Sequence, residues 1–203
     1  AVPELFYRNG SEYLPIKLSP GQRSQSCPIP QVHALELMQK MEKGESFADF
    51  DLVGLTPFPK GTKRALFLIE AAKESDKRDN GLPFRLIGMD DSLETVPSGS
   101  FRFMNLTPDS LRVEMAGTSQ ELAPSALTVI NPALTEDGAF VPVVIKSGDG
   151  RVLFENRLIA QPSGREMVII GPPAEGRTEL NVKFLSEVIP ASLKPGKKTS
   201  SKE

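Results

Sequence analysis

The chain has 203 residues, of which 24 are lysine or arginine and 26 are aspartate or glutamate, so its formal net charge is −2. This near balance argues against nucleic acid as a partner, because DNA and RNA are held through many contacts between basic side chains and phosphates. No apolar run approaches the roughly 18 residues that a membrane-spanning helix needs, and we expect no membrane span.

Strands are predicted along most of the chain from the alternation of apolar and polar residues, which marks a strand with one buried face. In chain order they lie at 14–18, 82–86, 101–103, 111–115 and 180–184. Two further runs, 65–69 and 167–170, are apolar throughout, which is typical of central strands with neighbours on both sides. The turn residues 147–150 predict a hairpin between 143–145 and 152–154.

The two halves of the chain repeat one order of features, which predicts a tandem duplication. The matched segments are 5–9 with 101–105, 14–18 with 111–115, 44–50 with 148–154, 59–61 with 162–164 and 64–69 with 165–170. The segment 33–43 contains good helix formers, yet in this alignment it lies opposite the strand that ends at Ile145. We therefore predict a strand there.

These strands favour an all-β chain of two tandem immunoglobulin-like, Greek-key β-sandwich units related by internal duplication. We place the first unit at 1–96 and the second at 97–190. The residues 191–203 are basic and polar without a strand pattern, and they are predicted to form a flexible tail.

Catalytic residue types are scarce in this chain. Cys27 and His33 are its single cysteine and single histidine, so a zinc site lacks ligands, and a Cys–His pair is disfavoured by the extended prolines between them. Carboxylates remain as candidates for glycoside hydrolysis or calcium binding. The acidic groups are Asp90-Asp91 with Glu94, Glu136-Asp137, and Glu45 with Asp49 and Asp51. A solvated turn is the alternative interpretation of such groups.

Four residues are candidate ligand or partner contacts: Arg64, Arg165, Asp90 and Asp91. Each arginine leads into one of the two apolar strands, so the pair could form a repeated ligand contact, an ion pair or a strand-edge cation. We assign no catalytic, cofactor-binding or metal-binding residue. Asn9 and Asn105 both begin a glycosylation sequon, and both are also turn residues that would end the first strand of each unit.

The segment 99–107, followed by an alternating strand that ends at Gly117, resembles the opening of uncharacterised bacterial extracytoplasmic β-sandwich families. The resemblance implies secretion and an immunoglobulin-like fold, and it brings no catalytic residue. Pilus chaperones have two such domains in a similar length, but their characteristic strand pattern is not found here. The start Ala1-Val2-Pro3-Glu4 would suit a mature protein after signal-peptide cleavage, and a tag remnant or a trimmed chain would look similar.

We therefore expect a non-enzymatic, secreted or periplasmic protein that binds or scaffolds an unknown protein or cell-envelope component, without a cofactor. The alternatives are a carbohydrate-active or calcium-dependent enzyme that uses the acidic groups, and a periplasmic assembly chaperone that donates an edge strand. A binding site is expected where the two copies differ, around 73–81 and 131–138, or in a groove between the copies.

Overall fold

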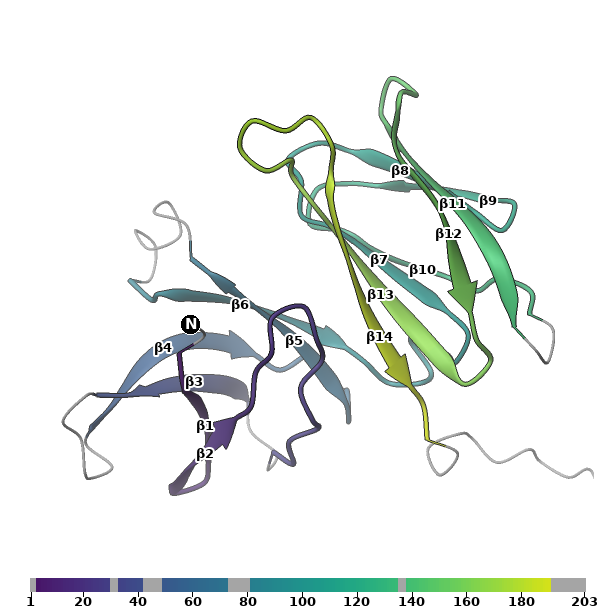
Figure 1. Cartoon of the computed structure of the whole chain (residues 1–203). Helices are drawn as coiled ribbons and strands as arrows, with labels where there is room; N and C mark the ends of the chain where they lie inside the picture. Colours follow the sequence, from purple (N-terminus) through teal and green to yellow (C-terminus); the bar gives the residue numbers. More distant parts are fainter. Residues whose placement is uncertain (1–2, 30–32, 42–48, 73–80, 135–137, 191–203) are drawn as a thin grey trace, which may run out of the picture. The chain divides into compact units, whose positions relative to one another are not determined.

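The computed structural model describes residues 3–29, 33–41, 49–72, 81–134 and 138–190. The chain divides into two compact units, Ala1–Thr95 and Val96–Glu203. The described residues form fourteen strands (Figure 1). No helix among them is long and apolar enough to cross a membrane. The predicted all-β sandwich class is therefore confirmed, whereas the predicted tail lies outside the described residues.

The first unit has one four-stranded antiparallel sheet and one two-stranded sheet. The four-stranded sheet has the order β2-β1-β3-β4, and among the described strands β5 pairs with β6 alone. The strands are β1 (Leu5–Asn9), β2 (Glu12–Ile16), β3 (Ala34–Lys40), β4 (Phe50–Pro57), β5 (Ala65–Ala71) and β6 (Phe84–Asp90). Leu86 of β6 packs with Leu5, Leu37 and Val53 of the larger sheet, so the core lies between the two layers.

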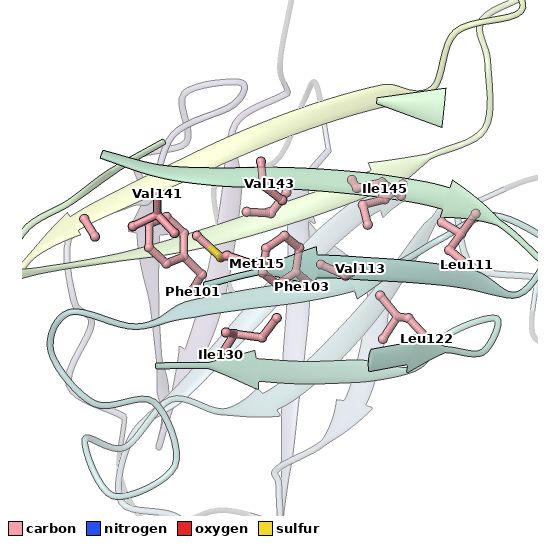
Figure 2. Close-up of a cluster of buried hydrophobic side chains, with 13 residues drawn as sticks. Phe101, Phe103, Leu111, Val113, Met115, Leu122, Ile130, Val141, Val143 and Ile145 are labelled. Atoms are coloured by element: carbon pink, nitrogen blue, oxygen red, sulfur yellow. The ribbon is translucent and has the colours of Figure 1, made fainter. Parts of the chain in front are cut away.

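The second unit is a sandwich of two four-stranded sheets, with the orders β12-β11-β8-β9 and β10-β7-β13-β14. Its strands are β7 (Phe101–Asn105), β8 (Leu111–Met115), β9 (Thr118–Leu122), β10 (Leu127–Ile130), β11 (Ala139–Ser147), β12 (Val152–Ala160), β13 (Gly164–Gly171) and β14 (Asn181–Val188). Figure 2 shows Phe101 and Phe103 of one sheet pointing toward Val141 and Val143 of the other. Each fully buried side chain of this kind contributes about 1.5–3 kcal/mol.

One sheet has the same strand order in both units. The order β2-β1-β3-β4 matches β9-β8-β11-β12, and the hairpin β5–β6 matches β13–β14. A β-bulge adds a finer match. In the first unit it directly follows Leu37, which pairs with Tyr7, and in the second it directly follows Ile145, which pairs with Val113. The equivalent strands are therefore β1 and β8, β2 and β9, β3 and β11, β4 and β12, β5 and β13, and β6 and β14.

This equivalence corrects part of the predicted alignment. Segments 5–9 and 101–105 are not equivalent by position, because β1 lies beside β2 in one sheet, whereas β7 and β8 lie in opposite sheets. The match of 14–18 with 111–115 is wrong for the same reason, because the strand order makes β8 the equivalent of β1 rather than of β2. Residues 44–48 of the predicted match between 44–50 and 148–154 lie outside the described residues, but the pairing of β3 with β4 corresponds to that of β11 with β12, and β5 corresponds to β13. The duplication itself stays a prediction.

Two strand assignments depend on sheet neighbours rather than on local sequence. The segment 33–43 contains β3, a strand as predicted, because Leu37 pairs with Tyr7 on one side and with Gly54 on the other. The run 167–170 lies in β13, which is central as predicted. The prediction that 65–69 is central is wrong for the described residues, because β5 has a neighbour on one side only.

Candidate ligand-binding groove

Arg64 and Asp91, two of the candidate contacts, form a partly buried ion pair in the first unit. The Arg64 Nε atom lies 3.2 Å from Asp91 Oδ2, and the side chain of Asp91 is 3% exposed. Arg23, from the loop between β2 and β3, also reaches Asp91 Oδ2, at 3.1 Å. Two arginines thus share one buried carboxylate, which ties the β2–β3 loop to the β5–β6 hairpin. Of the three roles that the sequence allowed for Arg64, the structure therefore shows the ion pair.

Asp90 forms the turn that follows β6. Its carboxylate accepts hydrogen bonds from the Thr62 hydroxyl at 2.6 Å, from the Ser92 backbone N–H at 2.9 Å, and from the Thr95 hydroxyl. Burial alone would raise the pKa of Asp90, but the hydrogen bonds from Thr62, Thr95 and Ser92 outweigh it and hold that pKa well below its usual range. Asp90 therefore stabilises a turn as a carboxylate.

Arg165 holds the start of the second unit. Its Nε atom donates to Glu187 Oε2 at 2.7 Å, and its Nη1 atom donates to the carbonyl of Val96 at 3.0 Å. The Arg165 side chain is 0% exposed, and that of Glu187 is 16% exposed. The structure therefore places Arg64, Asp90 and Asp91 together in one unit and Arg165 separately in the other.

A groove enclosing about 400 Å³ lies beside Arg165 in the second unit. It is lined by the last residues of β12, the last residues of β14 and the starts of β7 and β13, and we call it the seam groove. The volume falls within the range of about 300–1,000 Å³ that is typical of ligand sites. Two apolar side chains at its lining are strongly exposed: Val188 at 71% and Ile159 at 58%.

The seam groove exists because the sandwich is open along one margin. β12 and β14 are the terminal strands of their respective sheets, whereas the opposite terminal strands, β9 and β10, approach each other. Phe154 of β12 and Phe184 of β14 span the open margin, with their ring centroids 6.2 Å apart. Strand β14 thereby leaves one edge unpaired next to the groove.

The free edge of β14 can be assigned residue by residue. The Ile189 N–H donates to the carbonyl of Ser163, so these two residues form a hydrogen-bonded pair of the antiparallel ladder. Because such pairs recur every two residues, Glu187 of β14 and Arg165 of β13 form the next one. The alternate residues Phe184, Ser186 and Val188 then direct their backbone N–H and C=O groups away from β13, and all three line the groove. Within the described part of the chain, these groups have no backbone partner.

The seam groove contains one ion pair and two further charged side chains. Arg165 and Glu187 neutralise each other, and Ser186 donates to the Glu166 carboxylate at 2.8 Å. Arg157 contributes a positive charge from β12. The lining thus combines apolar surface, two carboxylates and two guanidinium groups, a combination found in ligand-binding sites.

The other sequence candidates are not assembled into a site. Cys27 is half-buried against the core of the first unit, and burial raises the pKa of its thiol. His33 is exposed. Among the described residues, no three cysteine, histidine or acidic side chains are grouped to hold a metal ion. Glu45, Glu136 and Asp137 lie outside the described residues, as do 73–80 and 135–137 of the two segments where we expected a site, 73–81 and 131–138.

Sequence reasoning missed Arg157, Glu166, Ser186 and Val188, which line the groove. Each lies in a strand whose pattern of apolar and polar residues is common to edge and central strands alike. Local sequence therefore did not indicate that β12 and β14 lie at the edges of their sheets. Comparison with known proteins adds no assignment: no family model matches the chain, and no curated protein matches it.

Proposed function

We propose that this protein is a non-enzymatic binding or scaffolding protein of the cell envelope or exterior, and that its seam groove holds an extended segment of a partner polypeptide. The observation that carries the proposal is the coincidence of the groove with the free edge of β14. The same three residues, Phe184, Ser186 and Val188, line the groove and direct unpaired backbone groups along it.

An extended polypeptide is the class of ligand that suits this edge. A strand edge offers N–H and C=O groups at regular spacing, and only another extended backbone can pair with several of them at once. Alternate side chains of the bound segment would meet the apolar lining, including Val188 and Phe184. Neither β12 nor β14 contains a proline, a residue that commonly protects free edges from pairing.

The location outside the cytoplasm is supported by the resemblance of segment 99–107 to bacterial extracytoplasmic β-sandwich families. The proposal of a non-enzymatic role is supported by the bonds of the two candidate carboxylates: Asp90 accepts hydrogen bonds within a turn, and Asp91 is paired with Arg64. A fusion that reports export, made with the natural gene, tests the location, and a cytoplasmic fusion product would contradict it.

Random nonapeptides displayed on phage and selected against the full chain are the probe for the groove. We expect selected peptides to bind the variant Val188→Lys about tenfold more weakly, because a charge enters the apolar lining. Val152→Lys is the matched control, since Val152 is also exposed on an edge strand but lies outside the groove. Equal loss in both variants, no loss in Val188→Lys, or failure to select any peptide would contradict the proposal.

A further inference from the structure

Strand β5 of the first unit has an edge without a backbone partner among the described residues. The Asp91 N–H donates to the carbonyl of Arg64, and the Ala72 N–H donates to the carbonyl of Pro83. Since hydrogen-bonded pairs recur every two residues in an antiparallel ladder, the even-numbered residues from 64 to 72 form these pairs with β6. The odd-numbered residues Ala65, Phe67 and Ile69 therefore direct their N–H and C=O groups away from β6. We call this the β5 edge.

The sequence of β5 is that of a strand with two neighbours. Residues 66–69 are apolar without interruption, yet all of them remain partly exposed. The equivalent strand β13 is also apolar at 167–170, and there all four residues are buried. The two strands differ in pairing: β13 lies between β14 and β7, whereas β5 pairs with β6 alone.

In the second unit, strand β7 occupies the position that is open beside β5. It runs parallel to β13. In this ladder the Glu166 N–H donates to the carbonyl of Ser100 at 3.0 Å, and the Leu106 N–H donates to the carbonyl of Ile170 at 2.7 Å. Through this pairing, Phe101 and Phe103 enter the core, where their exposed fractions are 1% and 0%. The strand thus supplies both backbone partners and two large core side chains.

The backbone groups of the two units correspond in register. Arg64 and Arg165 each bind the carboxylate opposite them in the hairpin, so Ala65 is equivalent to Glu166 and Ile69 is equivalent to Ile170. The residues of β13 whose backbone groups bond to β7 are therefore equivalent to the residues of β5 whose backbone groups point out of the β5 edge.

The core of the first unit is also incomplete in the same place. Phe67 and Ile69 pack against that core but stay partly exposed. Their equivalents by register, Val168 and Ile170, are buried in the same cluster as Phe101 and Phe103 of β7, with exposed fractions of 1% and 0%. A strand along the β5 edge would cover Phe67 and Ile69 in the same manner.

We propose that the β5 edge accepts a strand from a partner polypeptide, parallel to β5, with two bulky apolar side chains two residues apart. The incoming strand takes the place that β7 has in the second unit. Its alternate apolar side chains face the core of the first unit, and its backbone bonds to Ala65, Phe67 and Ile69. This site is separate from the seam groove and does not depend on it.

A synthetic peptide with the sequence of residues 99–107 (GSFRFMNLT) is the probe, because it carries the strand that pairs with β13. Mixed with the full chain, it should slow amide hydrogen exchange at Phe67 and Ile69 by about tenfold or more, since new hydrogen bonds protect those amides. The same peptide with serine in place of both phenylalanines is the control, and it should give no protection.

Ala65→Pro provides the test of backbone pairing. It removes the N–H equivalent to the Glu166 N–H that bonds to Ser100, and it should weaken peptide binding about three- to tenfold. Ala65→Val keeps the N–H and is the matched control. The variant Val188→Lys should bind this peptide as the unmodified chain does, so a failure here is distinguishable from a failure of the seam groove.

Three results would overturn the proposal. The first is that Phe67 and Ile69 exchange as slowly as Leu66 and Leu68 in the free chain, because the edge would then already be paired. The second is equal protection by the serine peptide. The third is a response confined to the second unit, with faster exchange in β7, because the peptide would then have displaced β7 rather than joined β5.

Discussion

Arg165 lies directly opposite Glu187 in the β13–β14 ladder, and its Nε atom donates to Glu187 Oε2 at 2.7 Å. Arg64 has the same relation to Asp91 at the base of the β5–β6 hairpin, at 3.2 Å. Each unit thus begins the equivalent hairpin with an arginine bound to a carboxylate across the strands. The two arginines are structural residues at corresponding places, and this relation aligns the units residue by residue.

Replacing Arg165 by methionine should destabilise the second unit by about 3 kcal/mol, because the change removes a fully buried guanidinium and its ion pair with the largely buried Glu187 carboxylate. Urea unfolding followed by circular dichroism measures this loss. Arg112→Met is the control, since Arg112 and Glu121 form a well-exposed pair, and it should leave the midpoint almost unchanged. Similar losses in both variants would contradict the structural role of Arg165.

Asn105 should be the more sensitive of the two sequon asparagines. Its side-chain nitrogen donates to the carbonyls of Asp109 and Leu122, its oxygen accepts from the Thr107 N–H, and the residue is 0% exposed. We expect Asn105→Ala to cost about 3 kcal/mol, because buried polar groups lose their partners.

Asn9→Ala is the natural control for that change, because Asn9 lies at the β1–β2 turn and is only partly buried. It should cost less than about 1 kcal/mol. Glycosylation of Asn105 in the folded chain is also incompatible with its burial. A mass-spectrometric glycan on Asn105 of folded protein would contradict this arrangement.

Asp90 should make the first unit sensitive to acid. Its pKa is lower in the folded chain than in the unfolded chain, so its contribution to stability is complete above about pH 4 and is lost as the pH falls through the folded pKa. Asp90→Asn should lower stability at neutral pH and flatten the dependence of stability on pH below about 4. Thermal melts between pH 2 and 7 measure this, and parallel curves for both proteins would refute it.

Cys27 should react slowly with iodoacetamide in the folded chain. Burial raises the pKa of its thiol, so the fraction of reactive thiolate at neutral pH is smaller than in free cysteine. Mass spectrometry of the alkylated protein over time measures the rate, and the same reaction in urea is the control for the unfolded chain. A folded rate equal to or above the rate in urea would show that Cys27 is an activated thiol.

Much of the secondary structure follows from local patterns. The alternation at 111–115 predicts β8 with its bounds, and the turn at 147–150 predicts the β11–β12 hairpin. These predictions succeed because the side-chain period of a strand with one buried face is a property of consecutive residues. Arg64, Arg165 and Asp91 were also singled out from the sequence, but the pairing of Arg64 with Asp91 and the partner of Arg165, Glu187, were not.

The sequence by itself determined that this chain is all-β and that it has a single cysteine and a single histidine to offer to a catalytic or zinc site. Only the tertiary structure decided which strands end their sheets. β5 and β13 have similar apolar sequences, yet one is an edge and the other is central, because β7 lies beside β13 alone. Neighbours come from distant parts of the chain, so the seam groove and the β5 edge, which depend on those neighbours, could not be read from local sequence.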